Sequence, residues 1–174
     1  GPSESMPAKL AALEATVASL QAQVTDLKDK VDSYQEFFDY VTVDQSEIEG
    51  LKGPHVIFTG ANVHIRSGSG CTDDWTYFGD NNLLGLGNLI VGYNEQWGIV
   101  YFPDRTSTGS HNLVVGPGHE YISYGGFVAG YGNYIRAPYS SVSGGQFNAV
   151  SGYYSSVSGG YHNVAEGDHS SISG

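Results

Sequence analysis

The stretch Ser140-Ser141-Val142-Ser143-Gly144-Gly145 returns fifteen positions later as Ser155-Ser156-Val157-Ser158-Gly159-Gly160. Each copy contains a shorter unit, a hydrophobic residue followed by any residue and a small one, which recurs every seven or eight positions towards Gly174. These units begin at Val128, Ile135, Val142, Val150, Val157, Ala165 and Ile172. A fixed short period is typical of stacked turns that cover one another. The sequence therefore predicts a parallel β-roll or β-prism solenoid.

Within this repeat the side chains have predictable places. Val142, Val150, Val157 and Ile172 are expected to point into the roll, and the glycines to turn the chain where a side chain has no room. Asn133, Asn148 and Asn163 recur at the same fifteen-residue interval, and Ser and Asn can satisfy backbone groups in turns.

The composition excludes some classes of function. The 174 residues carry a net charge of −11 with only 7 Lys and Arg, so nucleic acid and anionic membrane surfaces are not expected partners. The 25 glycines are about twice the usual share, which favours repeated tight turns. Cys71 is the single cysteine, so neither an intrachain disulfide nor a cysteine zinc site is expected.

The N-terminal part has a different pattern. Hydrophobic residues alternate at spacings of three and four, which defines a heptad seam and predicts a parallel coiled coil over 6–44. The predicted seam consists of Leu10, Leu13, Val17, Leu20, Val24, Leu27, Val31, Tyr34, Phe38 and Val41. Val at a and Leu at d favour a dimer by the simplest rule, whereas the aromatic residues at the end of the seam favour a trimer. We expect a homotrimer.

The remaining boundaries follow from composition. Residues 1–5 resemble a protease-tag remnant, and 45–66 are expected to form a neck with short strands at 55–59 and 62–66. An irregular β region with loop insertions is expected over 67–124, and the regular repeats over 125–174. The last unit stops inside a repeat, so we expect the array to continue in a longer parent protein. No membrane span is visible.

The repeats resemble the head domains of trimeric autotransporter adhesins. Those heads are left-handed parallel β-rolls with units of the form Asn/Ser-x-Ala/Val-x-Gly-x-x-Ser-x-Ala/Val-x-Gly, and residues 148–159 and 163–174 fit this pattern. The resemblance implies an extracellular fibre that attaches to surfaces. A coil that precedes a Gly-rich β tip is also similar to phage-type receptor-binding fibres. We expect no cofactor and no catalytic residue.

Candidate binding residues lie in the two irregular loops. Trp75, Tyr77, Trp97 and Tyr101 could stack on sugar rings or anchor a protein interface, or they could plug the trimer interface and cap the roll. The repeat tyrosines could line an exposed face or cover the seams between rolls.

Ion sites and acid–base pairs have weaker support. Asp73, Asp74 and Asp80 could hold calcium, but their spacing matches no known calcium loop, and a solvated acidic loop is the simpler interpretation. His64 could meet its copies at a trimer axis. His119-Glu120, Asp168-His169, and Asp104 with His111 could be acid–base pairs, although no catalytic motif accompanies them.

We therefore expect a structural and binding segment of an extracellular trimeric fibre, not an enzyme, with a surface glycan or matrix protein as its partner. Two alternatives stay open. A phage-type fibre that degrades polysaccharide would need paired carboxylates in a cleft. A passive spacer would bind nothing.

Overall fold

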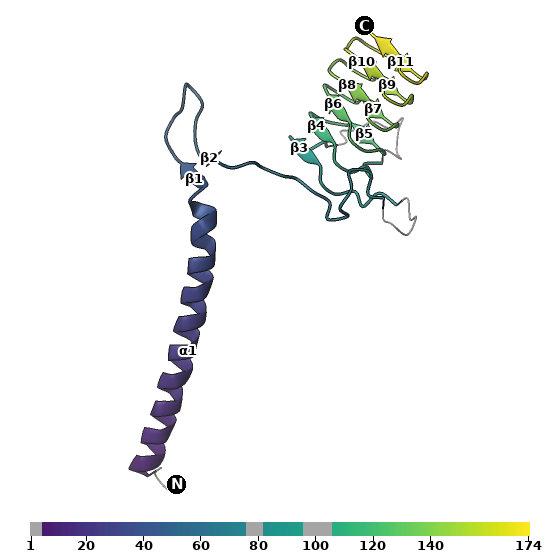
Figure 1. Cartoon of the computed structure of the whole chain (residues 1–174). Coiled ribbons are helices and arrows are strands. Elements are labelled where there is room, and N and C mark those ends of the chain that lie inside the picture. Colours follow the sequence, from purple (N-terminus) through teal and green to yellow (C-terminus); the bar gives the residue numbers. More distant parts are fainter. Residues whose placement is uncertain (1–4, 76–81, 96–105) are drawn as a thin grey trace. The chain divides into compact units, whose positions relative to one another are not determined.

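The structure is a computed structural model that describes residues 5–75, 82–95 and 106–174 (Figure 1). The chain forms two compact units, Gly1–Val63 and His64–Gly174, and each is described by itself.

The first unit begins with one long helix, α1, which spans Met6–Phe38. The carbonyl of Ser5 accepts hydrogen bonds from the amides of Ala8 and Lys9, and Pro7 stands in the first turn, where no amide hydrogen is needed. No residue of α1 is buried within this chain. In the described part of the chain no helix is both long and apolar enough to cross a membrane.

The helix ends earlier than the heptad pattern predicts. β1 (Val41–Asp44) pairs antiparallel with β2 (His55–Phe58), with Val41 opposite Phe58. Val41 therefore lies in a strand and not in a helical seam, which corrects the predicted extent of 6–44. The physical reason is the β-branched run Val41-Thr42-Val43, which favours a strand once a partner is present. The predicted strand at 55–59 is confirmed over His55–Phe58, whereas 62–66 forms no strand.

The second unit is a parallel β-solenoid, as the fifteen-residue repeat predicts. Figure 1 shows its short strands stacked in rows along the unit. One sheet has the strand order β12-β10-β8-β6-β4-β3 and the other β11-β9-β7-β5, so from β4 onwards successive strands alternate between the two sheets. The strands of the first sheet are β3 (Leu89–Val91), β4 (Leu113–Val115), β6 (Phe127–Ala129), β8 (Ser141–Val142), β10 (Ser156–Val157) and β12 (Ser171–Ile172). The strands of the second are β5 (Glu120–Tyr121), β7 (Tyr134–Ile135), β9 (Ala149–Val150) and β11 (Val164–Ala165).

The core consists of inward side chains, one from each strand from β4 to β12. Val142, Val150 and Val157 are fully buried and Ile172 is partly buried, which confirms their predicted direction. The other members are Val114, Tyr121, Val128, Ile135 and Ala165. Because each turn contributes only about two core side chains, neighbouring turns stabilise one another.

The regular part begins earlier than position 125. β4 and β5 already pair in register with β6 and β7. The predicted boundary was too late because the sequence here lacks the Ser-Gly signature, although the inward Val114 and Tyr121 keep the seven-residue spacing.

A ladder of side chains, here called the asparagine ladder, runs beside the core. Its members are Asn94, His119, Asn133, Asn148 and Asn163. In each step the backbone amide of one member donates to the side chain of the member one turn before it, at 2.7–3.2 Å. Asn148 shows the full pattern, because its side-chain amide also donates to the carbonyl of Gly160 at 3.0 Å. Buried backbone groups at the turns are satisfied in this way.

Candidate functional site

The predicted acidic loop forms a buried polar cluster around Asp74. The carboxylate of Asp74 accepts hydrogen bonds from the hydroxyl of Ser67 and from the amide of Leu84 at 2.8 Å. His111 lies next to it: its Nε2 accepts from the amide of Ser67 at 3.0 Å, and its Nδ1 lies 2.8 Å from the carbonyl oxygen of Thr72. The cluster connects the segment 67–74 with Leu84 and His111, which are distant from it in the sequence.

The electrostatics of Asp74 follow from these donors. Burial alone would raise the pKa of the carboxyl, but hydrogen bonds from Ser110, Ser67 and the Leu84 amide outweigh burial and hold the pKa far below its usual range. Asp74 is therefore a buried, ionised anchor for the loop.

This finding corrects the interpretation of Asp74 as part of a solvated loop. Its side chain is only 1% exposed, and both carboxylate oxygens are engaged by protein donors. Asp80 lies outside the described residues. Within the described ranges no group of three or more His, Cys, Asp or Glu side chains could hold a metal ion.

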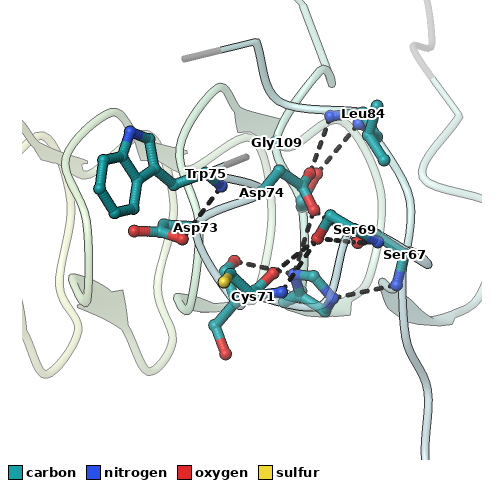
Figure 2. A network of polar contacts seen from close by, with 12 residues as sticks. Ser67, Ser69, Cys71, Asp73, Asp74, Trp75, Leu84 and Gly109 are labelled. Carbon is teal, nitrogen blue, oxygen red and sulfur yellow. Dashed lines mark hydrogen bonds and ion pairs between the residues drawn. The ribbon is translucent and has the colours of Figure 1, made fainter. Parts of the chain in front are cut away.

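An open groove lies beside this cluster. It has a volume of about 350 Å³ and both aromatic and polar walls, and we call it the aromatic groove. Its lining residues are Asp73, Trp75, Leu83, Ser123, Tyr124, Arg136, Pro138 and Tyr153. Trp75 and Tyr153 are each 51% exposed. Figure 2 shows that the Trp75 ring projects away from the Asp74 cluster, although the two residues are adjacent in sequence.

The backbone conformation explains why the side chains of Asp74 and Trp75 point in different directions. Asp74 has a positive φ of 55°, and the amide of Trp75 donates to the carboxylate of Asp73 at 3.1 Å. The resulting tight turn directs Asp74 into the protein and Trp75 outwards. The buried Asp74 cluster therefore positions one of the two half-exposed rings of the groove.

The cationic group that lines the groove is already paired with a carboxylate outside the lining. Arg136 donates from Nε to the carboxylate of Glu120 at 2.7 Å, and its guanidinium lies 5.1 Å from the ring centre of Tyr134. Burial, followed by the neighbouring Tyr139 and Asp73, raises the pKa of the Tyr124 hydroxyl, so Tyr124 stays protonated and can donate at neutral pH. Asp73, which lines the groove, contributes acceptor oxygens.

Many other aromatic rings are engaged with one another. Tyr139 and Tyr154 stack at 5.3 Å, and Tyr154 and His169 stack at 5.2 Å. Each of these rings shares a face with its neighbour in a column along the solenoid, so it offers less flat surface than Trp75 or Tyr153. In the described part of the chain, neither Trp75 nor Tyr153 stacks on another ring.

Of the four predicted binding residues, only Trp75 is described by the structure. Tyr77, Trp97 and Tyr101 lie outside the described residues. Sequence reasoning missed Ser123, Tyr124, Arg136 and Tyr153 as groove residues, because they belong to three different turns that only folding brings to Asp73 and Trp75.

In the described residues the histidines named from the sequence contact several different groups. His119 belongs to the asparagine ladder, with Nε2 3.0 Å from the carbonyl of Val115. His169 stacks on Tyr154, while Asp168 accepts from the amide of Tyr153 at 2.9 Å. His64 lies 3.3 Å from a guanidinium nitrogen of Arg66. Asp104 lies outside the described residues.

No protein-family model, no curated protein and no solved structure matches this chain. The β-solenoid is therefore established by its own strand pairing. No known protein supports the resemblance to adhesin heads.

Proposed function

We propose that this chain is a segment of an extracellular trimeric fibre or adhesin. In this proposal α1 forms a parallel coiled-coil stalk with two further copies, and each copy displays a β-solenoid head for attachment to a surface glycan or a matrix protein.

The observation that carries the proposal is the exposed apolar seam of α1. Its helical members, from Leu10 to Phe38, are between 44% and 64% exposed in the single chain. Soluble proteins seldom leave such a continuous apolar stripe in water, and a heptad repeat is the pattern that parallel helices bury against each other.

The solenoid gives a second reason for self-association. In the first sheet, the outward positions in register are Leu89, Leu113, Phe127, Ser141, Ser156 and Ser171. Leu89 and Leu113 are 48% and 37% exposed, so this face is apolar over β3, β4 and β6 and polar over the later strands. An apolar patch of this kind at one end of a sheet favours contact with another copy.

Trimerisation would also serve attachment. Three heads on one stalk bind a repetitive surface with avidity, so each single site can be weak. The acidic charge keeps the fibre soluble and disfavours anionic surfaces.

The test measures binding of the purified chain to immobilised glycans and matrix proteins. The variant Leu20→Asp is measured in the same assay. Leu20→Asp places a charge in the seam and should separate the copies, so avid binding should weaken at least tenfold. Ala22→Asp adds the same charge on the opposite face of α1 and serves as the matched control. Equal binding by all three proteins would contradict the proposal.

The polysaccharide-degrading alternative is tested separately. Incubation with a panel of capsular polysaccharides should release no new reducing or unsaturated ends. Their appearance would favour an enzyme instead of an attachment segment.

A further inference from the structure

We propose that the aromatic groove is a carbohydrate-binding site for a neutral pyranose. This inference rests on the proposed attachment function and names the class of ligand and the residues that bind it.

The shape of the groove suits a sugar ring. A volume of about 350 Å³ lies at the small end of the roughly 300–1,000 Å³ usual for ligand pockets. The groove is open among the described residues, so a terminal or internal residue of a longer glycan has room to enter.

The chemistry of the walls suits a pyranose. Such a ring has an apolar C–H face and a rim of hydroxyl groups, so it needs a flat apolar partner and hydrogen-bonding groups at its edge. Trp75 and Tyr153 are half-exposed rings that stack on no other ring within the described ranges, so they can supply the flat surface. Asp73 offers acceptors, and Tyr124 and Arg136 offer donors.

The charge balance selects a neutral sugar. Among the residues that the structure describes, Arg136 is the single cationic side chain of the lining, and Glu120 already pairs with it. Asp73 adds a negative charge on the same surface, and the whole chain carries −11. A uronate or sialate carboxylate would meet net repulsion here, whereas a neutral hexose would not.

Two other hollows fit a sugar less well. One, of about 370 Å³, has Arg66, Cys71 and His111 in its lining, and none of its described lining residues is Trp, Tyr or Phe. Both ring nitrogens of His111 already contact backbone groups. The other has a volume of about 230 Å³ and shares Arg136 with the aromatic groove. Its lining is mainly apolar and includes Phe147 and Val164.

The experiment screens the labelled full chain on an array of neutral gluco-, galacto- and manno-oligosaccharides together with uronate and sialylated glycans. The best ligand is then titrated by calorimetry against Trp75→Ala, Tyr153→Ala and the control Tyr93→Ala. Tyr93 is 92% exposed in the same unit and does not line the groove, so it matches the loss of an exposed ring.

We expect binding to neutral glycans, a loss of roughly tenfold or more for each groove variant, and no change for Tyr93→Ala. Tyr153→Ala keeps the test valid should Trp75→Ala fail to fold, which circular dichroism would detect. Binding to none of the glycans, binding only to acidic ones, or unchanged binding by both groove variants would overturn the site.

The two proposals can fail separately. A trimer that binds a matrix protein through another surface leaves the attachment function intact and removes the glycan site. If the chain is monomeric but binds neutral sugar weakly, and Trp75→Ala abolishes that binding, the glycan site is supported. The trimeric fibre is then contradicted.

Discussion

The ring nitrogen Nδ1 of His119 accepts a hydrogen bond from the backbone amide of Asn133 at 3.2 Å. One turn later the side chain of Asn133 accepts from the amide of Asn148 at 2.8 Å. The histidine thus occupies an asparagine position in the asparagine ladder, and with Nε2 placed to donate to the carbonyl of Val115 it is the neutral Nε2–H tautomer.

The substitution His119→Asn should therefore be tolerated better than His119→Leu. Leucine fills similar space but offers no acceptor, so it leaves the buried amide of Asn133 without its partner, a cost of about 1–3 kcal/mol. The carbonyl of Val115 would still accept from the amide of Gly130. Denaturant unfolding of the two variants measures the difference. Equal free energies of unfolding would show that His119 is held by packing alone.

Removing a central member of the asparagine ladder should be costly. Asn148→Leu deletes the acceptor for Asn163 and the donors to Asn133 and Gly160, so we expect a loss of about 1–3 kcal/mol in the free energy of unfolding. Gln146 carries an exposed amide in the same turn, and Gln146→Ala should change stability by less than about 0.5 kcal/mol. Similar losses in the two variants would contradict a structural role for the ladder.

Two glycines from successive copies of the repeat should respond oppositely to alanine. Gly145 has φ of 76°, and an added Cβ would lie 2.2 Å from the carbonyl oxygen of Gly160, so Gly145→Ala should destabilise the solenoid by at least about 2 kcal/mol. Gly159 has nothing within 4 Å of an added Cβ, and Gly159→Ala should be neutral or slightly stabilising. The melting temperatures of Gly145→Ala and Gly159→Ala, compared with that of the unaltered chain, test whether the turns are as closely spaced at Gly145 as the structure shows.

The Asp74 cluster predicts a dependence of stability on pH. Folding lowers the pKa of Asp74, so its ionised form favours the folded state. This contribution is complete above the unfolded carboxyl pKa of about 3.9 and is lost as pH falls through the lower folded-state value. Asp74→Asn should lower stability at pH 7 by about 1–3 kcal/mol and reduce the loss of stability below about pH 4. Unfolding curves from pH 7 to pH 2 provide the measurement, and parallel curves for the two proteins would exclude Asp74 as the source.

The repeat part of the fold was readable from the sequence because its signal is local and periodic. Val142 and Val157 occupy equivalent positions in successive turns, so one inward residue predicts the next. The ladder position of His119 was not readable in this way, since a single histidine breaks the asparagine pattern and only the strand register reveals its equivalence.

The candidate site was only partly predictable for the same reason. Trp75 was identified as an aromatic residue in a loop, but its neighbours Tyr124, Arg136 and Tyr153 meet it only after the chain has coiled through several turns. The buried state of Asp74 depends on Leu84 and Ser110, which no short motif connects to it. The end of α1 before Val41 likewise depends on the pairing with Phe58.

The mass of the purified chain in solution, measured by light scattering behind a sizing column, tests the central claim most directly. Three copies wound through the seam of α1 would give about 55 kDa, three times the 18.5 kDa of one chain, and Leu20→Asp should reduce it while Ala22→Asp should not. A mass of 18.5 kDa for the unaltered chain would contradict the proposed trimeric fibre.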